Sequence, residues 1–455
     1  MTLNRRNFLA GTAAMTGAAM LPKAVLAADA IKLGSILDTS GIFDAYGKPM
    51  DMALRLAVNE LNGAGGLLGR QIEVVSYDTQ SDMALYSQYA QQLTRQDKVD
   101  VVHGGILSAS REAIRQTMRK NKTLYFYNVQ YEGGVCDRNI FCNGLTPAQQ
   151  AAALVPWALK EAGGKKVYTL AADYNYGQIT ARWIQKFVEE AGGEVVGTDF
   201  FPLDVADFGA TIAKVQTAAP DLVIAPLVGG AHLSFFRQWA ASGMKDKIPL
   251  ASTTMGVGNE HKVLTPEEGN GIMVAYSYSQ DLETAENASF KDRWTAAYGD
   301  PTALHELAVS TYYGVHTWAK AVAQAGSIER DAVTAALETG ISVDGPAGKY
   351  TVDPKTHHAT VDVHLMKVQD HKMKVIETLS QRPPIDTQAV CDLNANPDDN
   401  TQRNPDLTRK TGRQARRTAA PTPPGGRSSA PKRYRKQRWT SHSSYSWKCS
   451  MPSPR

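Results

Sequence analysis

Two tyrosines in the segment 173–177, Asp-Tyr-Asn-Tyr-Gly, offer the clearest candidate for ligand chemistry in the chain. The rings of Tyr174 and Tyr176 have apolar faces, and their hydroxyls can donate or accept hydrogen bonds. Groups of this kind recognise a small molecule without transforming it. The same rings could instead only pack the loop that carries them, and the segment by itself leaves both interpretations open.

A strand and a helix must hold this segment between them. The apolar run 167–171 is typical of a strand buried on both faces. Apolar residues recur at helical spacing over 181–188, and Gly192-Gly193 ends that predicted helix because glycine adopts a left-handed cap without strain. Open α/β sheets bind ligands in loops at the carboxyl ends of parallel strands, which is where this segment falls.

The same order of strand, loop and helix recurs along the chain. Strands that alternate with helices of this length favour parallel sheets, and one sheet seldom grows across so many units. We therefore expect two α/β lobes. Strands are predicted near 31–36, 72–75, 99–102, 124–127, 167–171, 221–225, 249–252 and 271–275, and helices near 49–61, 84–96, 111–120, 148–162, 208–218 and 231–243.

Charge and motifs argue against several classes of function. The formal net charge is +4, but 14 of the 49 Lys and Arg residues lie in 401–455, beside the single acid Asp406. The body 29–400 is acidic, with a net charge of about −12, so it gives no reason to expect nucleic acid. No Gly-x-Ser-x-Gly elbow or phosphate-binding loop is present, and His357-His358 is expected in an exposed turn. We expect no catalytic residues, no cofactor and no metal.

Both ends of the chain differ in composition from the body. Residues 1–28 have a basic start, a mild apolar run and a small-residue cleavage pattern, and Arg5-Arg6-Asn7-Phe8-Leu9 resembles a twin-arginine export signal. We therefore expect a periplasmic protein that does not span the membrane. Residues 401–455 are rich in basic residues, Pro and Ser, and such a composition predicts a disordered tail. A frameshift or read-through past a natural end near Asn400 would explain the tail.

A series of short motifs along the body resembles the branched-chain amino acid and amide binding proteins of ABC transporters. The resemblance covers about 31–400 and implies an α/β fold, the type I periplasmic binding protein. That fold has two Rossmann-like lobes with a ligand cleft between them and three crossovers, expected near 146, 276 and 345. It implies lobe 1 from 30–146 and 277–345, and lobe 2 from 147–276 and 346–390. The motifs are Ser40-Gly41, Tyr46-Gly47, Asn59-Glu60-Leu61-Asn62, Gly65-Gly66, Leu68-Gly69-Arg70, 173–177, Tyr313-Gly314-Val315, 319–322 and 345–348.

Three further stretches look like the urea and short-chain amide branch of that family: 127–133 (Tyr-Asn-Val-Gln-Tyr-Glu-Gly), 353–358 and Cys391-Asp392-Leu393. The resemblance implies an extracytoplasmic protein that captures a small polar ligand and delivers it to permease subunits of an ABC importer. We expect the protein to be a monomer. An amide sensor of the same fold is an alternative, against which the export signal argues.

The resemblance also places ligand-binding residues. It puts Ser108, with the amides near Ala109 and Ser110, at a helix start, where backbone N–H groups favour a carbonyl oxygen or a carboxylate. The two serines could instead only cap that helix. Tyr127, Val129 and Tyr131 would line the lobe 1 side, Tyr174, Tyr176 and Thr254 the lobe 2 side, and Phe43 and Tyr46 the apolar end unless they belong to the core.

Hydroxyls and backbone amides suit a neutral ligand such as urea or an amide, because a buried net charge is costly unless it is paired. An amino acid would need an acid for its ammonium group, and Glu132 or Asp173 could serve. Branched-chain amino acids therefore remain an alternative ligand. The stretch 255–261 matches no part of the amide pattern with certainty, and Val129 stands where some amide binders have a hydroxyl.

Four cysteines occur: Cys136, Cys142, Cys391 and Cys449. In an oxidising compartment Cys136 and Cys142 could close a short loop beside the site. Four cysteines allow three complete pairings, and the sequence does not choose among them or exclude free thiols.

Overall fold

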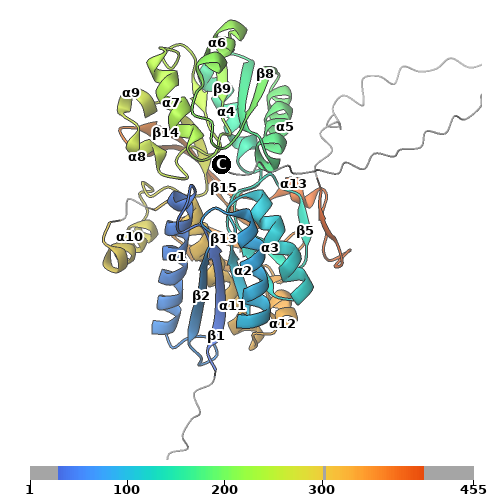
Figure 1. Cartoon of the computed structure of the whole chain (residues 1–455). Helices are drawn as coiled ribbons and strands as arrows, with labels where there is room; N and C mark the ends of the chain where they lie inside the picture. The colour runs from blue at the N-terminus through green and yellow to red at the C-terminus, as the bar shows by residue number, and fades with distance from the viewer. Residues whose placement is uncertain (1–28, 301–303, 404–455) are drawn as a thin grey trace, which may run out of the picture. The chain divides into compact units, whose positions relative to one another are not determined.

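The computed structural model describes residues 29–300 and 304–403 (Figure 1). The predicted export signal, 1–28, and all but the first three residues of the predicted tail lie outside this part. Among the described helices, none has both the length and the apolar character that crossing a bilayer requires.

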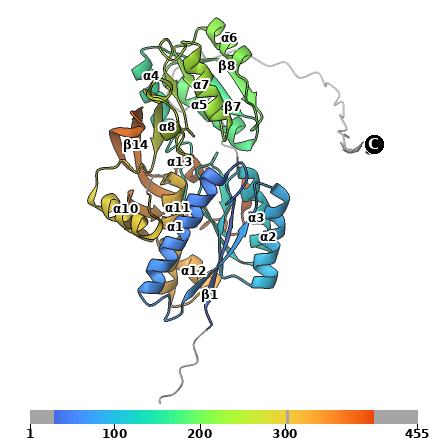
Figure 2. The ribbon, with the colours of Figure 1, turned by 60° about the vertical axis from the view of Figure 1, so that its left-hand side comes forward.

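The first sheet is parallel and has the strand order β2-β1-β3-β4-β6. Helices α1 and α11 pack together, as do α2 and α3, and the two pairs flank the sheet (Figure 2). The strands are β1 (Ile31–Leu37), β2 (Ile72–Asp78), β3 (Val101–Gly104), β4 (Leu124–Tyr127) and β6 (Ile140–Cys142). The helices are α1 (Asp44–Gly63), α2 (Met83–Gln92) with a π-helical turn at Leu93–Asp97, α3 (Ser108–Asn121), α10 (Ala285–Tyr298), α11 (Glu306–Ala325) and α12 (Arg330–Leu337).

The second sheet has a parallel part, β8-β7-β9-β10-β11, that β14 extends in the antiparallel direction. β14 also pairs with β15 and β13, and β13 with β12. The strands are β7 (Lys166–Ala172), β8 (Glu194–Phe201), β9 (Leu222–Ile224), β10 (Leu250–Ala251), β11 (Met273–Tyr276), β12 (Ser342–Gly345), β13 (Gly348–Val352), β14 (Ala359–Gln369) and β15 (Lys372–Arg382). The helices are α4 (Ala151–Ala162), α5 (Asn175–Glu190), α6 (Gly209–Ala218), α7 (Ala231–Ala241), α8 (Glu260–Val263), α9 (Pro266–Gly269) and α13 (Ile385–Gln388).

The chain passes between the sheets after β6, after β11 and again between α12 and β12, close to the three positions expected. Strand β12 falls inside the range assigned to lobe 1, yet it pairs through β13 with the second sheet. The predicted alternation of strands and helices thus yields two sheets, and the buried apolar side chains of both form the core.

The end of the described chain returns to the first half of the molecule. Strand β16 (Asn400–Gln402) pairs antiparallel with β5 (Val135–Asp137), and a disulfide joins Cys136 of β5 to Cys391. The suggested bond between Cys136 and Cys142 is therefore wrong, and Cys142 is a buried free thiol. The tail boundary at 401 is also wrong, because Thr401 and Gln402 complete a backbone ladder.

Candidate functional site

Strand ends, loops and helix starts of both sheets line a partly open cavity of about 40 Å³. Of the predicted site residues, Ser108, Tyr127, Val129, Tyr174, Tyr176 and Thr254 line it together. Ala109, Ser110, Tyr131 and Phe43 do not. The lining also includes Tyr46, which the resemblance had placed at the apolar end, together with Ile106, Leu107, Gln130, Val228, Val257 and Leu307.

Two Tyr-Gly pairs bring tyrosines into the cavity from helices of the two sheets. A Cβ on Gly47 of α1 would lie 2.0 Å from the Asp38 carbonyl oxygen, and one on Gly177 of α5 would lie 2.0 Å from that of Ala172. Only glycine permits this close approach of a helix to the end of the preceding strand. The tyrosine before each glycine, Tyr46 or Tyr176, therefore lies at the strand end, where it lines the cavity.

Ser108 opens helix α3, and no side chain caps the helix start. The first backbone N–H groups of a helix lack partners within it, so this end favours a carbonyl or carboxylate oxygen. The Ser108 hydroxyl donates to Glu132 Oε2 at 2.5 Å. The Ser110 hydroxyl points back to the preceding residues, where it accepts a hydrogen bond from the Ile106 N–H and donates one to the Leu107 carbonyl. Ala109 is exposed. Of the three, only Ser108 lies at the cavity.

Glu132 is buried behind Ser108 and paired with Arg111, whose Nη2 lies 3.0 Å from Glu132 Oε1. Burial alone raises the pKa of Glu132, but the charge of Arg111 and the hydrogen bonds to Arg111, Ser108 and Gln402 hold that pKa below its usual value. The guanidinium also stacks over the rings of Tyr127 and Tyr131, 5.3 and 4.6 Å from their centroids. Tyr131 therefore supports the cavity wall from behind instead of lining it.

Tyr127, Val129 and Gln130 form the wall that follows β4. The Tyr127 hydroxyl donates to the Ile106 carbonyl at 2.7 Å. Gln130 reaches across to the second sheet, because its Nε2 donates to the Thr253 carbonyl at 2.6 Å. Its Oε1 is buried and accepts no hydrogen bond from the described residues. Such an acceptor can receive an N–H from a ligand.

Hydroxyl groups dominate the opposite wall. The Tyr176 hydroxyl lies 2.9 Å from Thr253 Oγ1, and Tyr174 is half-buried beside it. The Thr254 hydroxyl donates to the Leu227 carbonyl at 2.5 Å and lies 2.8 Å from His232 Nε2. This wall offers hydroxyls and aromatic faces without a charged group.

Phe43 packs under Tyr46, with ring centroids 5.9 Å apart, and both are buried. The Tyr46 hydroxyl accepts the Gly229 N–H at 3.1 Å, which joins the two halves. Gln130 and Val257 are lining residues that sequence reasoning missed. Gln130 stands between two predicted residues in the motif 127–133, which was the available signal; Val257 lies in the stretch 255–261 that matched no pattern.

His357 and His358 are both buried, so the expected exposed turn is wrong. His357 stacks on Phe141 with centroids 4.1 Å apart, and its Nε2 lies 3.2 Å from Glu338 Oε1. His358 hydrogen-bonds the Tyr131 hydroxyl. Within 29–300 and 304–403, no group of three or more His, Cys, Asp or Glu side chains is arranged to hold a metal ion.

Residues 30–372 match the family model described as periplasmic binding protein. The Leu/Ile/Val-binding protein homolog 6 of Brucella melitensis is 24% identical over 361 residues, covering 78% of this chain and 92% of that protein. A solute-binding protein of an ABC transporter from Rhodopseudomonas palustris, solved with 4-hydroxybenzoate, has a TM-score of 0.70 and 25% identity over 78% of this chain and 98% of that one.

A branched-chain amino acid transporter substrate-binding protein from Streptococcus pneumoniae, solved with isoleucine, superimposes with a TM-score of 0.68 and 23% identity. That match covers 77% of this chain and all of the other. The fold is therefore that of a type I periplasmic binding protein, as the sequence motifs indicated. The family match spans most of the chain and includes every residue that lines the cavity, so the chain belongs to the periplasmic binding protein family.

Proposed function

We propose that this protein is the extracytoplasmic solute-binding component of an ABC importer and captures urea or a short-chain amide between its two lobes. One observation carries the proposal: a small cavity with tyrosine and uncharged polar walls, built from loops of both sheets. Membership of the family and the ABC-transporter proteins among its structural neighbours support the transport role. A permease complex is then the partner.

The volume of the cavity favours a very small ligand. A cavity needs at least roughly 10–15 Å³ of such space to hold a single water molecule. The 40 Å³ here is a small volume that favours a ligand with few non-hydrogen atoms, such as urea or acetamide. Leucine and 4-hydroxybenzoate are more than twice as large, so the walls would have to separate to admit them.

The polar groups also match an amide. Its carbonyl oxygen can accept from the backbone N–H groups at Ser108, and its NH₂ can donate to the free Oε1 of Gln130 or to a tyrosine hydroxyl. An amino acid would bring an ammonium group, but Glu132 is already paired with Arg111, and Asp173 is exposed and bonded to Gln178. Neither acid lines the cavity.

Isothermal calorimetry with urea, acetamide, formamide, leucine, valine, glutamate and 4-hydroxybenzoate tests the proposal, alongside thermal-shift measurements. We expect binding of urea or an amide and at least tenfold weaker binding of the larger compounds. Assays for ammonia should show no turnover. Tight binding of leucine or 4-hydroxybenzoate without binding of amides would replace the proposed ligand, and hydrolysis by the purified protein would refute the binding role.

A further inference from the structure

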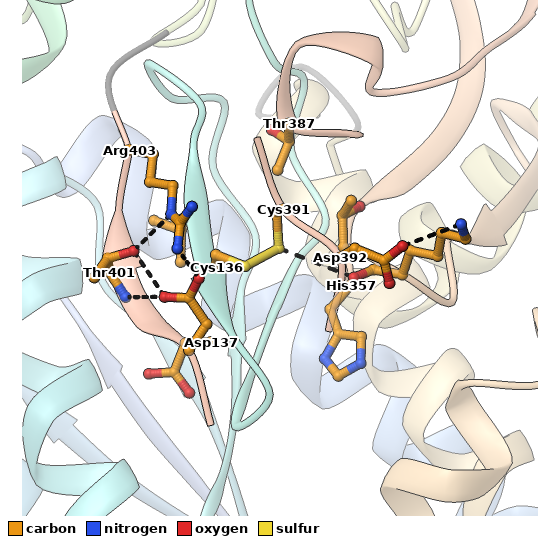
Figure 3. The surroundings of a disulfide bond; sticks show 12 residues. Cys136, Asp137, His357, Thr387, Cys391, Asp392, Thr401 and Arg403 are labelled. Carbon is orange, nitrogen blue, oxygen red and sulfur yellow. Dashed lines mark hydrogen bonds and ion pairs between the residues drawn. A yellow bond between two sulfur atoms is a disulfide. The ribbon is translucent and has the colours of Figure 1, made fainter. Parts of the chain in front are cut away.

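The C-terminal strap, which we define as residues 391–403, is fastened to the cavity wall at several points. Its first residue forms the disulfide with Cys136, and its last four pair with β5 and the preceding Gly134 (Figure 3). The wall-forming segment 127–130 and Glu132 lie in the chain immediately before β5. The strap thus holds the strand that ends this wall segment.

Gln402 makes the most direct connection between the strap and the site. Its Nε2 donates to Glu132 Oε1 at 2.5 Å and lies 3.2 Å from the Gly133 carbonyl oxygen. Its Oε1 accepts from Arg111 Nη2 at 3.1 Å. One amide therefore serves both members of an ion pair whose side chains are fully buried. Buried charges need such hydrogen bonds, because each unmet one carries a large desolvation penalty.

The cluster reaches the cavity through Ser108. Glu132 Oε2 accepts from the Ser108 hydroxyl, and Ser108 lines the cavity at the start of α3. The same helix is tied to the strap by Arg115, which donates to the Asn400 carbonyl at 2.8 Å, and by Arg119, which donates to the Asp398 and Asp399 carbonyls. The strap therefore holds both the helix start and the wall segment in place.

We propose that the strap is a positioning element of the ligand site, in which Gln402 orients Glu132 and Ser108 and the Cys136–Cys391 disulfide fixes the wall segment through β5. The inference about ligand affinity rests on the proposed function, whereas the inference about the wall does not depend on the ligand's identity. Gln402 is a positioning residue, since it does not line the cavity.

The test combines hydrogen exchange of segment 127–137 in the full chain without ligand with calorimetry using urea and acetamide. For Gln402→Ala we expect about tenfold faster exchange in that segment, about tenfold weaker binding and a modestly lower melting temperature without global unfolding. Thr401→Val is the matched control, because the partners of the Thr401 side chain among the described residues, Asp399 and Arg403, both lie within the strap. It should behave like the parent in both measurements.

Exchanging the carboxylate and the amide between positions 132 and 402 should restore the binding that is lost in the single variant. Gln402→Glu places a second carboxylate beside Glu132 and should weaken binding more than Gln402→Ala. Combining it with Glu132→Gln returns one carboxylate and one amide to Arg111, and we expect most of the affinity and protection to return. A structural role for the bulk of Gln402 alone predicts no such recovery.

The disulfide is tested by Cys136→Ser, Cys391→Ser and the double variant. All three should accelerate exchange in 127–137 to the same extent, since each removes the same bond. Unchanged exchange in these variants and in Gln402→Ala would overturn the proposal, and so would global unfolding of Gln402→Ala. If no urea or amide binds to the parent, the proposed function fails, and the exchange measurements still decide the role of the strap.

Discussion

At the residue scale, the hydroxyls of Tyr46, Ser108, Tyr127, Tyr176 and Thr254 in the cavity already have protein partners but retain capacity for a ligand. The Tyr176 hydroxyl shares a hydrogen bond with Thr253, and a hydroxyl can donate once while accepting further bonds. The orphaned Oε1 of Gln130 is a second available group. The site can therefore match a ligand that both donates and accepts hydrogen bonds, as urea and amides do.

Tyr176→Phe should weaken ligand binding by about tenfold to a hundredfold, because the loss of one hydroxyl leaves a buried ligand group unpaired, at about 1–3 kcal/mol. Tyr174→Ala should weaken binding further, since ring and hydroxyl are lost together. Calorimetry measures both. Tyr168→Phe is the control, because its hydroxyl bonds Asp199 outside the cavity. Variants that bind like the parent, or that mainly unfold the ligand-free protein, would show that the tyrosines only pack the loop.

The buried carboxyl group of Glu306 should make the stability of the protein depend on pH. Burial raises its pKa to about 7, although Ser277 donates to it through both its hydroxyl and its N–H. The folded protein then holds a proton that the unfolded chain has released, so stability falls as pH rises between about 4.5 and 7. Glu306→Gln should remove this loss and stabilise the protein at pH 8 by at most about 3 kcal/mol.

Unfolding of the parent and Glu306→Gln in guanidinium chloride at pH 5 and pH 8 measures the effect. Guanidinium chloride is the denaturant because urea is itself a proposed ligand. The exposed Glu283→Gln is the control and should follow the parent at both pH values. If the stability difference between parent and Glu306→Gln is the same at both pH values, Glu306 does not titrate in this range.

At the element scale, β16 extends the described fold past the tail boundary that the sequence predicts. Strand pairing and the side chain of Gln402 make residues 401–403 part of the first half, although their composition continues into the basic tail. A sequence-based boundary at 401 misses this because a three-residue strand has no periodicity of its own.

Two truncated chains distinguish a fold boundary at Arg403 from one at Asn400. A chain that ends at Arg403 should keep the parent's melting temperature and affinity, whereas one that ends at Asn400 should lose the β16 ladder and the Gln402 bonds and bind more weakly by about tenfold. Thermal melts and calorimetry on both truncations check this. Equal behaviour of the two would mean that β16 contributes nothing measurable.

The start of helix α1 is a smaller difference between the sequence-based prediction and the structure. The sequence places the helix start near Pro49, because proline favours a first turn, whereas α1 begins at Asp44 and contains Pro49 in its interior. The five added residues include the Tyr46-Gly47 pair that reaches the cavity. The glycine packs closely against the Asp38 backbone, and α1 continues through Pro49 although proline lacks the N–H of one helical hydrogen bond.

At the scale of the whole molecule, the cavity walls come from opposite sheets, and direct bonds such as Gln130 to Thr253 and Gly229 to Tyr46 join them. A ligand held on both sides bridges the two lobes, which is the usual basis of hinge closure. Ligand binding should therefore favour the compact arrangement.

Saturating acetamide should reduce the radius of gyration in small-angle X-ray scattering and stabilise the fold by about 2.7 kcal/mol at a hundredfold excess over the dissociation constant. Tyr174→Ala serves as a control, because it should reduce both responses at the same ligand concentration. A thermal shift without any change in scattering would show that the ligand binds to an already closed molecule.

Local patterns in the sequence predicted the alternation of strands and helices, the two-sheet architecture and the tyrosine loop, because hydrophobic periodicity and glycine positions are local properties. The resemblance of its motifs to a known family also named seven of the cavity residues, including Tyr46. The pairing of Cys136 with Cys391, 255 residues apart, and the burial of His357 and His358 became known only from the folded structure. The folded structure likewise assigned Glu132 to Arg111 and Gln402 instead of to a ligand. These outcomes depend on which distant segments the folded backbone brings within bonding distance, and no local pattern carries that information.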